Sequence, residues 1–322
     1  MNITRHISQP TLSANDVYDA QKKLLKLQWI AGIQGRDHLL ETTNARFPGL
    51  ALVGHLNFIH PNRAQVLGER ELNYLNSLTT EERTSTINTL FTCPETAIII
   101  IAVADYPDEL VQAANTYTVP LFHSSRSSPV IIEHLQYYLT RALAPRLTVH
   151  GVYMEVMGMG VLITGESGIG KSELALELLS RNHRLIADDA VEFMRVGPDV
   201  LVGQCPEALT DYLEVRGLSI INVRNMFGET AIRHKKKLHL IVTLRQLQQS
   251  DQGKIDRLQA EQLTRNILDV DIPEVILYVA PGRNLGILVE TATRSYILRM
   301  RGIDTLDEFS NRQQQLINQQ PK

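Results

Sequence analysis

The sequence predicts a two-domain α/β protein. The chain has 322 residues, more than a single hydrophobic core usually serves, so two domains are expected. Apolar runs typical of buried strands alternate with helical patterns, as in parallel sheets covered by helices. Residues 124–129, Ser-Ser-Arg-Ser-Ser-Pro, have the composition of a flexible linker. We therefore expect an N-terminal domain over residues 1–130 and a second domain over residues 131–322.

The first domain has βαβ character. Residues 97–102, Ala-Ile-Ile-Ile-Ile-Ala, predict a buried strand, residues 108–117 a helix, and residues 119–122 another short strand. Residues 130–139 carry apolar side chains at spacings of three and four, which predicts a helix. We expect this helix to lead the chain into the second domain, which opens at about Leu147.

A glycine-rich segment dominates the second domain. Residues 160–164, Gly-Val-Leu-Ile-Thr, predict a buried strand, and residues 173–179 predict a helix. Between them the phosphate-loop pattern G-x-x-x-x-G-K-[ST] is matched in full by Gly165, Glu166, Ser167, Gly168, Ile169, Gly170, Lys171 and Ser172. Backbone N–H groups of such a loop turn towards phosphate oxygens, the lysine reaches the terminal phosphates, and the hydroxyl binds Mg²⁺. The alternative is a chance glycine-rich turn, which this context disfavours.

Two adjacent carboxylates follow the loop. Residues 184–193 predict a strand that contains Asp188 and Asp189. Successive side chains of a strand point to opposite faces, so only one carboxylate would face a bound nucleotide unless the strand ends there. The pattern does not distinguish between the two. An acidic surface turn is the alternative, but a neighbouring phosphate loop favours a role in phosphoryl transfer.

A second charged pair, Glu214 and Arg216, lies in the otherwise apolar residues 213–223. Charges in an apolar segment need a partner, a metal ion or a phosphate. Two readings stay open: the two residues pair with each other or with a neighbouring strand, or they bind a ligand.

The motifs together resemble the bacterial HPr kinase/phosphorylase family. The resemblance is carried by G-E-S-G-I-G-K-S-E at the loop, R-L-I-A-D-D-A-V-E at the acidic pair, L-E-V-R-G-L-S-I-I-N-V at residues 213–223 and P-G-R-N at residues 281–284. Residues 46–54 and 63–72 resemble the amino-terminal domain of the same family. The resemblance covers most of the chain and implies that the second domain is a P-loop kinase domain related to carboxykinase-like folds. It implies phosphorylation of a regulatory serine on the phosphocarrier HPr, and its reversal by phosphorolysis.

The resemblance also implies individual roles. Lys171 and the loop would bind ATP or pyrophosphate, and Ser172 with Glu214 would hold Mg²⁺. His150, otherwise an ordinary histidine at a strand edge, matches the family's active-site histidine. Asp189, next to Asp188, matches the group that accepts the serine proton, and Arg257, otherwise a solvated helix residue, matches a catalytic arginine. The region tied to dephosphorylation would comprise Tyr278, Val279, Ala280, Pro281, Gly282 and Arg283.

Three positions depart from the family pattern. Ala280 stands where arginine is usual, Ser219 where glycine is usual in the signature, and Gln259 where glycine is common. Loss of a cation at residue 280 would weaken the binding of an attacking phosphate, so phosphorolysis is affected more than kinase activity.

Composition narrows the alternatives. The formal net charge is -3, without the basic field of a nucleic-acid binder, and we read the run His234 to Lys237 as the solvated start of a strand. Two cysteines, Cys93 and Cys205, suit reduced thiols in a cytoplasm. No membrane span or secretion signal is recognised. The resemblance implies a homo-oligomer, a hexamer. Rival functions are a nucleotide-gated binding protein without transfer activity and a small-molecule P-loop kinase.

Overall fold

The computed structural model describes residues 6–8, 10–40, 53–55, 63–247, 263–304, 308–309, 312 and 314–315. The chain divides into two compact units. One comprises Ser8–Pro145, and the other comprises Met1–Ile7 with Arg146–Lys322. Each unit is described by itself below.

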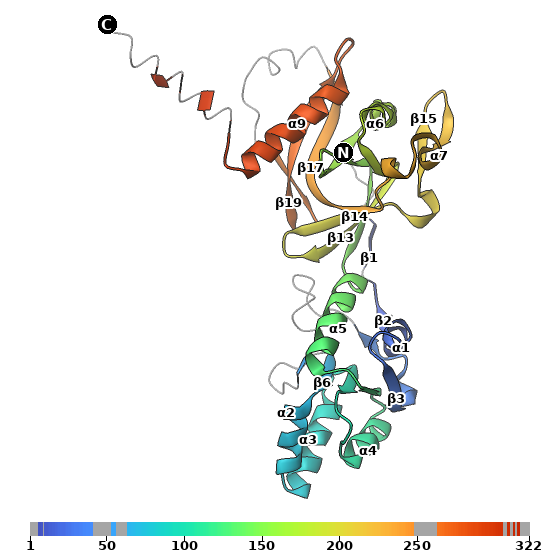
Figure 1. Ribbon diagram of the computed structural model, residues 1–322, viewed down its shortest axis with the longest axis vertical. Coiled ribbons are helices and arrows are strands. Elements are labelled where there is room, and N and C mark those ends of the chain that lie inside the picture. The colour runs from blue at the N-terminus through green and yellow to red at the C-terminus, as the bar shows by residue number, and fades with distance from the viewer. Residues whose placement is uncertain are drawn as a thin grey trace. The chain divides into compact units, whose positions relative to one another are not determined.

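The unit Ser8–Pro145 is built on a five-stranded sheet in the order β3-β8-β7-β6-β5 (Figure 1). Strands β5, β6, β7 and β8 are parallel, and β3 is antiparallel to β8. The strands of this sheet are β3 (Leu27–Ala31), β5 (Val53–His55), β6 (Ala64–Leu67), β7 (Ile98–Ile101) and β8 (Leu121–Ser124). Strands β2 (Leu12–Ser13) and β4 (Leu39–Leu40) pair with each other in a separate two-stranded sheet. Its helices are α1 (Ala14–Gln21), η1 (Ile33–Gly35), α2 (Glu69–Ser77), α3 (Thr80–Thr92), α4 (Asp108–Thr116) and α5 (Ser128–Ala142).

Both faces of this sheet are buried. In β7, Ile98 and Ile100 pack with α1 and α5, while Ile99 and Ile101 pack with α2, α3 and α4. Alternation of side chains along the strand sends the four isoleucines to two cores, which explains the uninterrupted apolar run. The predicted βαβ unit is confirmed as β7, α4 and β8.

The residues expected to link the domains lie inside this unit instead. Ser124 ends β8, is fully buried and donates a hydrogen bond to the carbonyl of Leu25. The helix that follows, α5, packs Ile131, Leu135 and Leu139 into the core of the same unit. The expected boundary at 130/131 therefore falls within α5, and the compact units separate after Pro145. Composition alone does not distinguish a short polar loop from a linker between domains.

The second unit is built on a ten-stranded sheet, in the order β1-β9-β13-β14-β17-β11-β10-β12, with β19 and β18 continuing from β17. Strand β17 runs parallel to both of its neighbours β11 and β19. The strands of this sheet are β1 (His6–Ser8), β9 (Arg146–His150), β10 (Val152–Val156), β11 (Met159–Gly165), β12 (Arg184–Ala187), β13 (Ala190–Gly197), β14 (Val200–Gln204), β17 (Lys235–Gln246), β18 (Leu263–Ile267) and β19 (Val270–Val279).

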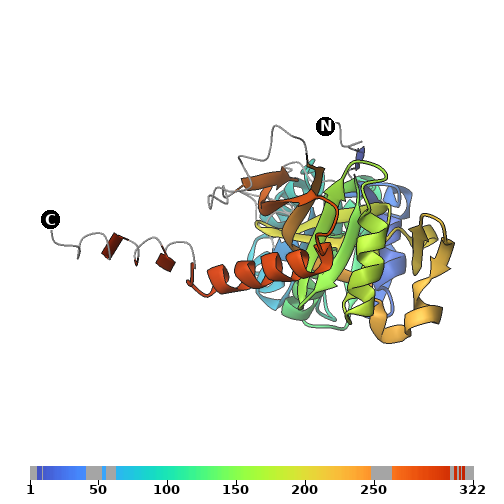
Figure 2. The same ribbon diagram turned by 90° about the horizontal axis from the view of Figure 1, so that it is seen from above.

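The remaining elements of this unit are helices and one hairpin. They are α6 (Lys171–Ser180), η2 (Glu207–Leu209), the hairpin of β15 (Tyr212–Val215) and β16 (Ser219–Asn222), α7 (Val223–Phe227), η3 (Glu229–Ala231) and α9 (Leu285–Met300). Val161 and Ile163 of β11 share a core with α6 and α9, and Leu162 packs into a second core with Ile241 and Phe193. Figure 2 shows the amino end of α9 next to α6. The predicted strand, loop and helix at residues 160–179 are confirmed.

Candidate functional site

The candidate site lies at the carboxyl edge of the parallel strands. Gly165 at the end of β11 is in register with Leu244 of β17, and Val279 at the end of β19 is in register with Gln246. The glycine-rich loop and the turn after β19 therefore leave the sheet at the same edge. In open α/β sheets, ligands bind beyond the carboxyl ends of such strands.

The glycine-rich loop, residues 166–170, connects β11 to α6. Gly168 and Gly170 have φ values of 75° and 99°, a left-handed conformation that glycine adopts without steric cost. Gly170 is the N-cap of α6, so the loop ends at the amino terminus of a helix, where backbone N–H groups lack partners.

Lys171 bends back over this loop. Its Nζ donates to the carbonyls of Gly165 at 3.2 Å and Glu166 at 3.0 Å, and the residue is only 8% exposed. Burial lowers the pKa of the ammonium group, while the carboxylates of Asp188 and Asp189 act in the opposite direction. The loop therefore holds a buried cation whose protein partners are two neutral carbonyls.

The predicted single strand at residues 184–193 is wrong, because it is two strands. Strand β12 ends at Ala187 and pairs with β10, whereas β13 begins at Ala190 and pairs with β9 and β14. Asp188 and Asp189 form the bend between them. The alternation of side chains along one strand therefore does not govern the two carboxylates.

Asp188 points into the protein. It is 7% exposed, and its Oδ2 accepts a hydrogen bond from the backbone N–H of Glu214 at 2.9 Å. Its Oδ1 accepts a longer hydrogen bond from Ser172 Oγ at 3.4 Å. Burial raises the pKa of this carboxyl group. Asp188 thus ties the start of α6 to the β15–β16 hairpin.

Asp189 points outward, and its side chain is 67% exposed. Its φ is 65°, and the N–H of Ala190 donates to the carbonyl of Asp188 at 2.8 Å. A hydrogen bond across one residue with positive φ is the rare, strained form of the γ-turn. The Oδ1 atom of Asp189 lies 2.9 Å from Nδ1 of His150, which ends β9. The turn therefore places an accessible carboxylate against a histidine from the neighbouring strand.

The side chains of Glu214 and Arg216 lie on the exposed side of the β15–β16 hairpin, whereas Leu213 and Val215 are buried. Neither charged residue forms an ion pair with the residues that the structure describes. The nearest atom to the place where a Cβ on Gly168 would stand is Nη1 of Arg216, at 3.5 Å. The guanidinium group therefore lies beside the glycine-rich loop.

The turn after β19 carries the residues that the resemblance tied to dephosphorylation. Arg283 N–H donates to the carbonyl of Ala280 at 3.3 Å, and Arg283 Nη1 donates to the carbonyl of Tyr278 at 3.4 Å. Gly282 has a φ of 82° and, like Arg283, is exposed. Arg257 lies outside the described residues.

Sequence reasoning missed a polar network under the loop. Thr164 Oγ1 lies 2.8 Å from Thr243 Oγ1, which donates to Glu274 at 2.5 Å, and Arg265 contacts both Thr243 and Glu274. Thr164 and Thr243 are paired in the register of β11 and β17. Each threonine interrupts an otherwise apolar strand, and this pattern could have indicated a buried polar network.

The oxygen atoms around Ser172 suit a magnesium ion. The Ser172 hydroxyl lies beside the Asp188 carboxylate, and Glu214, whose backbone N–H contacts Asp188, carries a second carboxylate; these are the hard ligands that Mg²⁺ takes together with water and phosphate oxygens. No group of three or more histidine, cysteine, aspartate or glutamate side chains able to hold a metal ion occurs among the described residues. Few protein ligands are expected where substrate phosphates complete the coordination.

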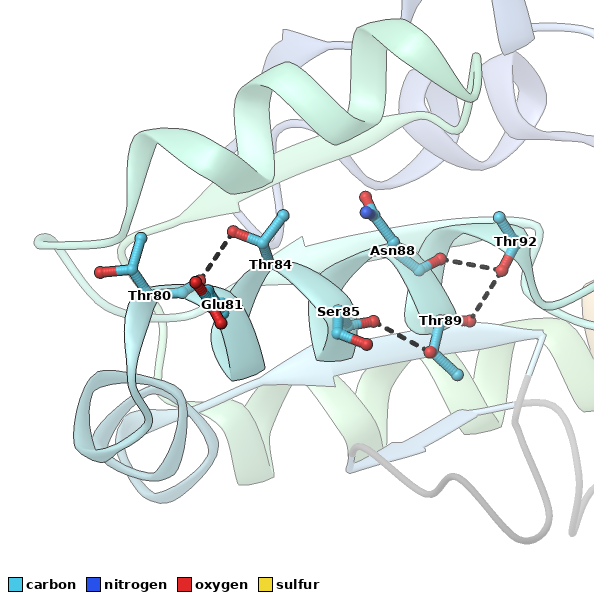
Figure 3. Close-up of a pocket in the computed structure, with 7 residues that line it drawn as sticks. All are labelled: Thr80, Glu81, Thr84, Ser85, Asn88, Thr89 and Thr92. Atoms are coloured by element: carbon cyan, nitrogen blue, oxygen red, sulfur yellow. Dashed lines mark hydrogen bonds between the residues drawn. The ribbon is translucent and has the colours of Figure 1, made fainter.

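A separate hollow lies on α3 of the other unit (Figure 3). It is lined by Thr80, Glu81, Thr84, Ser85, Asn88, Thr89 and Thr92. The hydroxyls of Thr84, Thr89 and Thr92 donate to carbonyls one turn earlier in the same helix. Because these hydroxyls already donate to backbone carbonyls, and the glycine-rich loop and the acidic pair lie in the other unit, the hollow is not part of the candidate site.

The chain is similar to known proteins over nearly its whole length. The family "HPr Serine kinase N terminus" matches residues 12–139, and "HPr Serine kinase C-terminal domain" matches residues 141–313. A protein of Xylella fastidiosa strain M12 named HPr kinase/phosphorylase is 46% identical over 97% of this chain and 99% of its own. A protein of the same name from Xanthomonas axonopodis pv. citri is 47% identical over 95% of this chain and 98% of its own.

A solved structure is also similar. "Structure of the Hpr(Ser) kinase/phosphatase from Coxiella burnetii" is 34% identical over 48% of this chain and 98% of that chain, with a TM-score of 0.43. No described helix is long and apolar enough to cross a membrane. With both domains matched and nearly the full length aligned at 46% identity, the chain belongs to the HPr serine kinase family.

Proposed function

We propose that this protein is a kinase/phosphorylase that phosphorylates a serine of HPr and removes that phosphate by phosphorolysis. The observation that carries the proposal is one sheet edge at which Lys171, Asp188 and Asp189 lie on adjoining segments. Family membership over both domains and the names of the full-length relatives support it.

The glycine-rich loop binds the phosphoryl donor, ATP or pyrophosphate. The ammonium group of Lys171 now contacts two loop carbonyls, and phosphate oxygens are stronger partners for a buried cation because they carry charge. Arg216, beside Gly168, adds a second cation at the loop.

Ser172, Asp188 and Glu214 would hold Mg²⁺, and the ion would supply positive charge to offset that of the phosphates. Asp188 is suited to this role because its carboxylate is buried and accepts hydrogen bonds from the Ser172 hydroxyl and from the backbone N–H of Glu214. A buried carboxylate gains most from a cation partner.

Asp189 is the general base, and His150 orients it. The two candidates left open by the sequence differ in accessibility: Asp189 is exposed and Asp188 is buried. A protein serine reaches only an exposed carboxylate. In the kinase direction Asp189 accepts the hydroxyl proton, and in phosphorolysis it returns that proton to the serine oxygen.

In phosphorolysis, inorganic phosphate attacks the phosphoserine, and serine and pyrophosphate form. The incoming anion needs cations beyond Lys171, and the exposed Arg283 at the same sheet edge is placed to supply one. Arg257, which lies outside the described residues, keeps its proposed catalytic role. We also propose a homo-hexamer, as the family resemblance implies, and, from the charge and the two cysteines, a cytoplasmic protein that binds no nucleic acid.

The test uses purified protein, HPr, Mg²⁺ and either ATP or pyrophosphate. Mass spectrometry should find one phosphate on a serine of HPr, and added inorganic phosphate should remove it with release of pyrophosphate. Nucleotide binding without transfer would favour a binding protein, and transfer only to a small molecule would favour a metabolic kinase. Either result would overturn the proposal.

A further inference from the structure

Glu290, in the second turn of α9, holds a buried carboxylate between several basic groups. The residue is 7% exposed. Arg181 donates Nε to Oε1 at 2.9 Å and Nη2 to Oε2 at 2.7 Å, and Nε2 of His183 lies 2.9 Å from Oε1. Bidentate pairing of this kind fixes orientation as well as distance.

The partners of Glu290 come from the segment that joins two site-bearing elements. Arg181 directly follows α6, which begins with Lys171 and Ser172. His183 directly precedes β12, whose end leads into the Asp188–Asp189 bend. Glu290 itself belongs to α9, which follows the turn 280–284. One carboxylate therefore joins three elements that carry candidate site residues.

A second contact shows that α9 is seated closely on α6. A Cβ on Gly286 would stand 2.4 Å from Oε1 of Glu177, so the carboxylate of Glu177 lies against the backbone of α9. The backbone of Gly286 lies against the side chain of Glu177 in α6, and Glu290 of α9 pairs with Arg181, which directly follows α6. A shift of α9 along α6 would break both.

The turn before α9 has little to hold it in place by itself. Its hydrogen bonds from Arg283 are 3.3 Å and 3.4 Å long, residues 281–284 are exposed, and the shorter bond, 2.8 Å from the N–H of Ile287 to Asn284 Oδ1, joins the turn to α9. Its position therefore depends on the elements at its two ends, β19 and α9.

We propose that Glu290 is a positioning residue for phosphorolysis, because it fixes the turn 280–284 relative to the glycine-rich loop. The inference rests on the proposed function and deepens it. Glu290 touches no reacting atom. It holds α9 against α6, and the position of α9 in turn sets the position of Arg283 near the attacking phosphate.

The test is Glu290→Gln in the full-length protein, with kinase and phosphorolysis rates measured on purified HPr. The amide lacks the charge that pairs with Arg181, and its NH₂ group would face a donor. We expect the KM for inorganic phosphate in phosphorolysis to rise about tenfold, as for a modest misplacement of a binding group. The KM for nucleotide in the kinase direction should change less than about twofold, since the loop contacts are untouched.

Arg294→Ala is the matched control, because Arg294 Nη1 lies 3.8 Å from Oε2 of Glu290 and its side chain is 55% exposed. We expect both KM values to stay within about twofold, as for an exposed ion pair. Should Glu290→Gln fail to fold, Arg181→Lys removes the bidentate geometry and keeps the charge. It should raise the KM for phosphate in the same direction, by about threefold.

A merely structural role would reduce the amount of active enzyme. It would lower kcat equally in both directions and leave both KM values unchanged, and that result would overturn the inference while the proposed function stands. If the unchanged protein shows neither activity, the proposed function fails and the inference fails with it.

Discussion

Replacing Asp189 separates its chemistry from its backbone conformation. Asparagine tolerates the positive φ of 65° but accepts no proton, whereas alanine loses both the carboxylate and the tolerance. We expect phosphoryl transfer in Asp189→Asn and Asp189→Ala to fall by about 10²–10⁴-fold, the usual contribution of a general base. Nucleotide and Mg²⁺ binding should remain.

Stability should distinguish the two variants. The Asp189–His150 pair is more than half exposed on both sides, and such pairs contribute about 0–1 kcal/mol. Alanine adds about 1–2 kcal/mol for the left-handed backbone, which corresponds to a Tm lower by about 2–8 °C for Asp189→Ala than for Asp189→Asn. The assays are phosphoserine formation on HPr and differential scanning calorimetry.

Asp188→Asn is the informative comparison. Its amide would place a donor against the N–H of Glu214, which now donates to Oδ2, at a cost of about 1–3 kcal/mol. An Asp189→Asn protein with near-normal transfer, together with an inactive but stable Asp188→Asn protein, would refute the assignment of Asp189 as the base.

Three further predictions follow from the same structure. Lys171→Ala should nearly abolish transfer in both directions without unfolding the protein, because either donor presents phosphates to the same buried site. Substantial transfer by the folded variant, measured with ATP and with pyrophosphate, would show that this loop is not the catalytic site. The wild-type protein should show weaker phosphorolysis than kinase activity, and Ala280→Arg should raise the rate of phosphorolysis with little change in the kinase rate. If both rates measured at saturating phosphate rise equally, or neither rises, residue 280 has no specific effect on phosphorolysis. The Arg181 and His183 contacts lower the pKa of Glu290 from 4.5 to about 2, so its contribution is complete above pH 4.5 and is lost as pH falls towards 2. After allowance for solvent screening, Glu290→Gln should remove about 1–2 kcal/mol of that acid-sensitive stability. Urea unfolding at pH 6 and pH 3 would measure it, and an equal loss of unfolding free energy from pH 6 to pH 3 in the wild type and the variant would contradict the prediction.

Local patterns were sufficient for the elements that carry strong periodicity. The isoleucine run of β7, the strand–loop–helix unit around Lys171 and the helix α4 lie within a few residues of their predicted positions. In each case the burial pattern and the turn chemistry are written in neighbouring residues.

Features that depend on distant pairing could not be predicted in this way. The strand around Asp188 ends because β12 and β13 pair with different partners, β10 and β9, and no local signal marks that change. The hydrogen bond from Glu214 N–H to Asp188 and the bidentate contact of Arg181 with Glu290 join residues far apart in sequence. Sequence patterns identified the candidate site residues, while their orientation and mutual contacts required the tertiary structure.

The positive φ of Asp189 limits which residues can replace it during evolution. Glutamate, the nearest substitute in chemistry, has no special tolerance for a φ of 65°, whereas asparagine, useless as a base, fits the backbone. If Asp189 is the base, replacement by asparagine thus leads to a protein that folds and binds nucleotide as before but transfers phosphate far more slowly. A lineage that lost the need for phosphorylation would be expected to keep its shape and carry asparagine here, so this one residue would mark such pseudoenzymes among relatives.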